Sequence, residues 1–152
     1  MPTGTVYTGS LENETIMTNY PEKILIVFAK AVEEEKAYLY WLINNGYPEL
    51  GALANALNTN EEAFQWLLKH KYPHFAAFSQ AVYDDKGALQ WLIKHRFALL
   101  AVLVEAINGK PEARRWLAEK KLDIFLMIAE KIRDCRKRKL DERGDYHKMF
   151  HP

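Results

Sequence analysis

Residues 60–83 read NEEAFQWLLKHKYPHFAAFSQAVY, and this stretch decides the fold class. Its first half places apolar residues, Trp66 and Leu67 among them, on one side of a helix and charged or amide residues on the other. Pro73 then interrupts the pattern, and proline fits the first turn of a new helix. The apolar residues that follow again have helical spacing. The stretch therefore predicts two short helices joined by a tight turn.

The same unit recurs along the chain every 25 residues. Four tryptophans, each followed by leucine, mark the first helix of each unit: Trp41, Trp66, Trp91 and Trp116. An apolar column marks the second helix: Leu25, Leu50, Phe75, Leu100 and Phe125. Registered columns at such a period are typical of stacked supersecondary units. We therefore predict an all-α fold in which short helix pairs of 25 residues stack as a small right-handed α-solenoid.

The columns also predict the domain organisation. A single helical-repeat domain over residues 21–140 contains a half repeat, with a helix near Pro21–Val32, and then four helix pairs. The last helix begins at about Leu122 and runs on through Cys135. Residues 1–20 are expected to be a flexible N-terminal arm. Residues 141–152 are expected to be a frayed C-terminal tail.

Local sequence predicts how some of these helices begin. Thr59 and Glu62 have the spacing of a capping box for the first helix of the second pair. Asp84 and Asp85 are candidate caps for the third pair. Pro111 is expected to open the first helix of the fourth pair.

The predicted architecture resembles the α-solenoid class in general, which contains the HEAT, armadillo and TPR proteins. The resemblance covers about residues 21–133 and is one of architecture only. The tetratricopeptide pattern is not met, because Trp41 is followed by Leu-Ile-Asn-Asn-Gly-Tyr, and the ankyrin Thr-Pro-Leu-His motif is absent. No family's functional residues can therefore be transferred to this chain.

Composition excludes several classes of protein. The 152 residues carry a formal net charge of +1, so no global field draws the protein to nucleic acid or to a membrane. No apolar run approaches the roughly 20 residues of a membrane helix, and we expect no membrane partner. Cys135 is the only cysteine, which excludes an intramolecular disulfide and fits a reducing compartment. We expect a cytoplasmic protein.

No motif in the sequence indicates catalysis, a cofactor or a metal. The histidines lack metal-ligand spacing, and no phosphate-binding glycine loop occurs. Cys135 continues an apolar stripe and is interpreted as a core residue. The four tryptophans are likewise interpreted as core residues rather than as a stacking platform. We therefore predict no catalytic, cofactor-binding or metal-binding residues.

Two features go beyond a plain helical core. The first is a group of apolar residues at positions where other copies carry Glu49 and Ala52, or His74 and Ala77. If exposed, this group would form a dimer or partner surface; alternatively, a terminal segment folds over it. Its members are Leu99, Val102, Ile124 and Met127.

The second feature is a basic run in the last helix. Residues 130–143 contain seven basic and four acidic residues, a net charge of +3. A charge run is usually a solvated face, but this one is also a candidate contact for phosphate or for an acidic partner. The candidate basic patch comprises Arg133, Arg136, Lys137, Arg138 and Lys139.

These observations lead to three functional hypotheses. The first is a non-enzymatic protein–protein interaction or scaffold module, because stacked helices expose long variable surfaces; a protein partner or self-association is expected. The alternative is a nucleic-acid-associated protein that uses the basic last helix. The third is an enzyme with no recognisable motif.

Overall fold

The computed structural model describes residues 15–150, and the side chains of residues 16–144. Every regular element in that range is a helix, so the all-α prediction is confirmed. The helices are α2 (Thr15–Thr18), α3 (Glu22–Val32), α4 (Lys36–Asn44), α5 (Pro48–Leu57), α6 (Glu61–Lys69), α7 (Pro73–Val82), α8 (Lys86–Lys94), α9 (Ala98–Ile107), α10 (Pro111–Glu119) and α11 (Asp123–Phe150).

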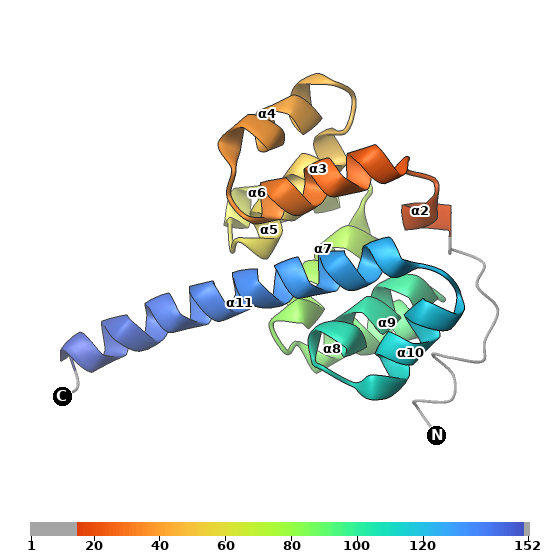
Figure 1. Cartoon of the computed structure of the whole chain (residues 1–152). Helices are drawn as coiled ribbons and strands as arrows, with labels where there is room; N and C mark the ends of the chain where they lie inside the picture. The colour runs from red at the N-terminus through yellow and green to blue at the C-terminus, as the bar shows by residue number, and fades with distance from the viewer. Residues whose placement is uncertain (1–14, 151–152) are drawn as a thin grey trace.

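An inner layer consists of the helices α3, α5, α7, α9 and α11. Each contacts the next member in chain order, and α11 also contacts α3 and α5. Figure 1 shows α11 as the longest helix, with α3 on one side of it and α9 on the other. The α3–α11 contact was not predicted, because in an open solenoid each unit contacts only its neighbours. The inner layer is therefore closed by its first and last helices.

Four shorter helices, α4, α6, α8 and α10, form an outer layer. Each packs against the two inner helices that precede and follow it in the chain. They begin 25 residues apart, as do α5, α7, α9 and α11. The buried core is contributed mainly by the inner helices, whose columns include Leu25, Leu50, Phe75, Leu100 and Phe125, all at most 2% exposed. The handedness of the arrangement stays a prediction.

The turns between these helices share one geometry. The residue after the C-cap has a positive φ in each of eight turns, at Glu34, Gly46, Thr59, Lys71, Asp84, Arg96, Gly109 and Lys121. The next backbone N–H then donates to a carbonyl five residues earlier, as Tyr72 does to Leu67 at 2.8 Å. These left-handed residues and bonds are those of a Schellman cap, which satisfies carbonyls at the helix end. Short helices can therefore end sharply and reverse direction.

Helix starts agree only partly with the capping predictions. The N-cap of α6 is Asn60, whose Oδ1 accepts from the backbone N–H of Ala63 at 2.8 Å. The prediction that Thr59 caps this helix is wrong, because Thr59 occupies the left-handed position of the preceding turn. Asp85 caps α8 in the way that Asn60 caps α6. Pro111 opens α10 as predicted.

Helices extend into both the expected arm and the expected tail. Within the expected arm, residues 15–18 form α2, and Met17 is buried. Residues 1–14 lie outside the described part. At the other end, α11 continues to Phe150, through most of the segment expected to fray. Whether that segment frays in solution stays a prediction.

Candidate interaction surfaces

The middle of α11, around Cys135–Arg138, crosses the C-terminal ends of the other inner helices. A helix end leaves four carbonyls without intrahelical partners and carries a partial negative charge. The ends of α3, α5, α7 and α9 all provide acceptors to side chains of α11. We call these contacts the α11 network. Its basic residues compensate the charge that accumulates where four helix ends converge.

Arg136 joins two of these ends. One guanidinium nitrogen, Nη1, donates to the carbonyl of Val82 at the end of α7, at 3.1 Å. The same nitrogen donates to Oδ1 of Asn108 at 2.6 Å, and Nη2 donates to the carbonyl of Ile107 at 3.2 Å. Arg136 thus bridges the ends of α7 and α9, a task that suits the fork geometry of a guanidinium.

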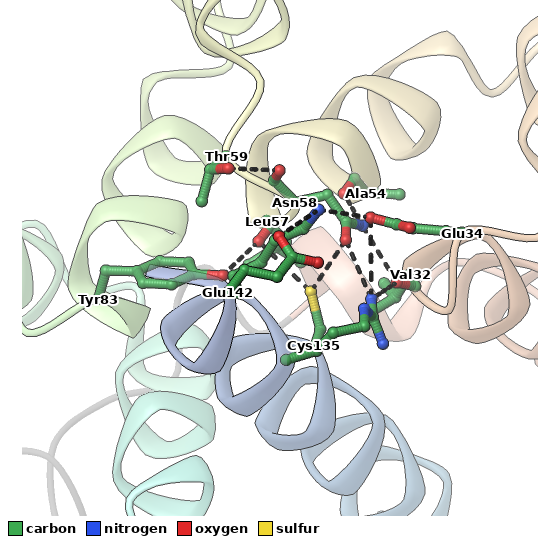
Figure 2. A network of polar contacts seen from close by, with 11 residues as sticks. Val32, Glu34, Ala54, Leu57, Asn58, Thr59, Tyr83, Cys135 and Glu142 are labelled. Carbon is green, nitrogen blue, oxygen red and sulfur yellow. Dashed lines mark hydrogen bonds and ion pairs between the residues drawn. The ribbon is translucent and has the colours of Figure 1, made fainter. Parts of the chain in front are cut away.

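Arg138 and Cys135 make the corresponding contacts on the other side. Nη2 of Arg138 donates to Oδ1 of Asn58 at 3.1 Å and reaches the carbonyl of Val32 at 3.5 Å. The Cys135 thiol lies 3.3 Å from the same Asn58 oxygen and 3.4 Å from the carbonyl of Leu57. Figure 2 shows the Cys135 thiol beside Asn58 and Leu57. The ends of α3 and α5 are thereby tied to α11.

The network is structural rather than reactive. Cys135 is buried, and burial raises the pKa of its thiol, so the thiol stays protonated at neutral pH. The thiolate is the nucleophilic form, and it needs an exposed, electropositive setting. The interpretation of Cys135 as a buried core residue is therefore confirmed.

The predicted basic patch is divided by this arrangement. Arg136, Arg138 and Lys139 are half-buried, and the ammonium group of Lys139 lies 2.7 Å from a Glu34 carboxylate oxygen. Arg133 and Lys137 are exposed. The structure therefore does not place all five residues on one solvated surface. Consecutive positions on a helix point in different directions, and here three of the five face the protein's own helix ends.

The predicted apolar patch is not assembled as expected. Leu99 is 2% exposed and Val102 is fully buried, while Ile124 and Met127 are half-buried. Of the two alternatives, an exposed surface does not apply to Leu99 and Val102, because α9 is enclosed by α7, α8, α10 and α11. The comparison with other copies was misleading, because the polar residues at the position of Leu99, Glu49 and His74, are themselves buried. Partner binding by Ile124 and Met127 stays a prediction.

The tryptophans also depart from the interpretation as core residues. Trp116 is 8% exposed, Trp66 and Trp91 are half-buried, and Trp41 is 43% exposed. Trp41, Trp66 and Trp91 share a kind of contact, because each stacks on the aromatic residue six positions later. The stacked pairs are Trp41–Tyr47 at 6.3 Å, Trp66–Tyr72 at 6.2 Å and Trp91–Phe97 at 5.7 Å between ring centroids. These stacks link each outer helix to the start of the next inner helix.

Among the described helices, α4 carries the most exposed large apolar side chains. Only Leu42 is buried on this helix, and Tyr40 is 56% exposed. We define the α4 face as the four exposed large apolar side chains of this helix, Tyr38, Tyr40, Trp41 and Ile43. Single exposed apolar residues are normal, but four large ones on one short helix make this helix a candidate interaction site.

The other outer helices provide an internal comparison for this face. At the position of Tyr40, they carry Gln65, Gln90 and Arg115, all exposed. At the position of Tyr38, they carry Ala63, Ala88 and Ala113, all buried. The same fold is therefore built without an aromatic residue at either position. An aromatic residue at these two positions is therefore particular to α4 among the four outer helices.

A cavity lies beside the α4 face. It has a volume of about 300 Å³ and is lined by residues of α4, α5 and α6, including Ile43, Ala52 and Trp66. We call it the α4–α6 hollow. Aromatic side chains that fill such hollows are the usual energetic anchors of protein interfaces. The α4 face and the α4–α6 hollow meet at Ile43, which belongs to both.

Sequence reasoning missed this surface although the sequence contained a sign of it. The comparison of copies was made on the second helices, where Leu99 stood out, and not on the first helices. Aligning Tyr40 with Gln65, Gln90 and Arg115 reveals an aromatic residue in a polar column. The sequence gives no comparable indication that Trp41 is exposed, because tryptophan occupies that position in every pair.

Among the described residues, no group of three or more side chains is arranged to hold a metal ion. No helix in that part of the chain is both long and apolar enough to cross a bilayer. Comparison with protein-family models, curated proteins and solved structures finds no match to this chain.

Proposed function

We propose that this chain is a closed helical-repeat protein and a non-enzymatic protein–protein interaction module, with the α4 face as its docking surface. The observation that carries the proposal is the exposure of Tyr40, at a position where three equivalent helices have polar residues. A repeat architecture supports it, because such folds present variable outer positions on a constant core.

The occupant that we propose for this surface is a second copy of the chain. The α4 helix carries Lys36 and no acidic residue, so two copies of the face meet with little charge repulsion. The face also offers both parts of a self-complementary contact, because Tyr40 is exposed and Ile43 of the same helix lines the α4–α6 hollow. In a two-fold interface the projection of one subunit enters the recess of the other, and the reverse contact follows from symmetry.

Nucleic-acid binding through the basic run is the weaker alternative. Phosphate contacts need free cationic side chains, and Arg136 and Arg138 are already used at the helix ends. Arg133 and Lys137 remain for such a contact, together with exposed Arg143.

Replacing the two aromatic residues by those of the other copies tests the docking surface. The double variant Tyr38→Ala and Tyr40→Gln should keep its melting temperature, because its new residues are those of α6 and α8 at the same positions. It should be a monomer by light scattering at concentrations where the wild type is a dimer. The control Gln90→Ala, at the equivalent exposed position of α8, should remain dimeric. A double variant that dimerises like the wild type would contradict the proposal.

A further inference from the structure

A second cavity lies at the opposite ends of the inner helices from the α11 network, beside α2. Its volume is about 400 Å³, and it is lined by Ile16, Asn19, Tyr20, Tyr72, His74 and Phe75. Four of the six lining residues have rings, and no lysine or arginine is among them. The cavity therefore offers aromatic surfaces and no positive charge at neutral pH, provided that His74 is uncharged.

His74 is held in its neutral form. It is 9% exposed, and its ring stacks on Phe97 with 4.9 Å between centroids. Burial lowers the pKa of His74 from 6.5 to about 4. Within the described part of the chain, its imidazole makes no hydrogen bond, although it lines the cavity.

A buried carboxylate lies behind the tyrosines. Glu49 is 8% exposed, and its Oε2 accepts a hydrogen bond from the hydroxyl of Tyr20 at 2.6 Å. The negative charge of Glu49 helps to raise the pKa of both Tyr20 and Tyr72, although burial is the larger cause for each. None of the ion pairs found among residues 16–144 involves Glu49. The start of α5 compensates part of this charge, but buried carboxylates normally have a cationic partner.

These features select one class of ligand. A cation enclosed by aromatic faces is attracted by their quadrupoles, and a nearby carboxylate adds to that attraction. A bare metal ion would require several oxygen or nitrogen ligands, and no such group occurs among the described residues. An anion would be repelled by Glu49. We propose that this cavity binds a small organic cation of the quaternary ammonium type, against the ring of Tyr20 and beside Tyr72 and His74, with Glu49 as its counter-charge.

The proposal is tested by titrating the full-length protein with choline and with its uncharged isostere dimethylbutanol. Backbone amide resonances of an isotope-labelled sample report where each probe binds. We expect choline to bind saturably at millimolar concentration, with the largest shifts around Tyr20, Tyr72 and His74. Dimethylbutanol should bind about tenfold more weakly or worse, because it has the same shape without the charge. Equal binding of the two probes, or no shift at these residues, would overturn the proposal.

A variant then tests the counter-charge. Glu49→Gln keeps an acceptor for the Tyr20 hydroxyl and removes the negative charge, so choline binding should weaken about tenfold while dimethylbutanol binding stays the same. Gln65→Ala, on the exposed side of α6, is the matched control and should bind choline like the wild type. If Glu49→Gln does not fold, the comparison of the two probes on the wild type still decides the question. Unchanged choline affinity in a folded Glu49→Gln protein would contradict the role of Glu49.

Discussion

At the scale of single residues, neighbours in the α11 sequence have opposite surroundings. Arg136 bridges the ends of α7 and α9, and Arg138 reaches the ends of α3 and α5, whereas Lys137 between them is exposed. The run looks uniform in the sequence because charge alone does not show direction. The physical reason for the basic residues is the concentration of unpaired carbonyls at four converging helix ends.

Replacing these arginines should therefore cost far more stability than replacing the lysine between them. Arg136→Met removes three hydrogen bonds of a charged donor, and it should lower the free energy of unfolding by about 1–3 kcal/mol. The control Lys137→Met should change it by no more than about 0.5 kcal/mol. Urea unfolding followed by circular dichroism measures both. Equal effects of the two substitutions would show that the α11 network contributes nothing to the free energy of unfolding.

His74 should make stability depend on pH. The pKa of His74 is about 4 in the folded protein and 6.5 ordinarily, so the unfolded chain binds the extra proton between these values. The free energy of unfolding should fall by about 2.5 kcal/mol as the pH drops from 6.5 to 4, and this contribution levels off about one pH unit above 6.5. His74→Phe should remove that part of the dependence. If the free energy of unfolding depends on pH in the same way for the wild type and the variant, His74 is not the cause of that dependence.

At the scale of elements, the turns determine where each short helix ends. Helices of nine to eleven residues are marginal alone, and each depends on ending where its neighbour begins. Eight left-handed residues set those ends, and only Gly46 and Gly109 among them are glycines. The other six adopt a conformation that disfavours a side chain.

Two substitutions test the left-handed turns in opposite directions. Gly46→Ala should lower the free energy of unfolding by about 1–2 kcal/mol. The cause is the backbone alone, because a Cβ at Gly46 would meet nothing within 4 Å. Lys71→Gly, at the equivalent turn, should raise the free energy of unfolding by about 0.5–1 kcal/mol. Thermal and urea unfolding give both values. A stabilised Gly46→Ala protein would be inconsistent with the observed φ of 93°.

At the scale of the whole molecule, the fold class and helix order were predictable because they depend on local patterns. Regular apolar columns and the breaks at Pro48, Pro73 and Pro111 mark most helices. The contact between α3 and α11 was not predictable, because it depends on how much each helix pair turns relative to the last. No residue type in α3 indicates that α11 will cover it.

The candidate surfaces were harder to predict than the fold, because exposure depends on tertiary packing. Leu99 stood out against Glu49 and His74, yet all three are buried, since that column faces the interior whatever residue occupies it. Tyr40 was overlooked, although its column is polar in every other copy. The polarity of Glu49 and His74 therefore did not reveal which face of the second helices meets solvent.

The central claim is that two copies associate through the apolar α4 face, and sedimentation equilibrium of the wild-type protein tests it most directly. The protein should behave as a dimer of the 17.7 kDa chain at high concentration, in low and in high salt alike. An apolar interface is not screened by salt, whereas an interface made by the basic run would weaken. A single species of 17.7 kDa at every concentration, or a dimer that salt dissociates, would contradict the account.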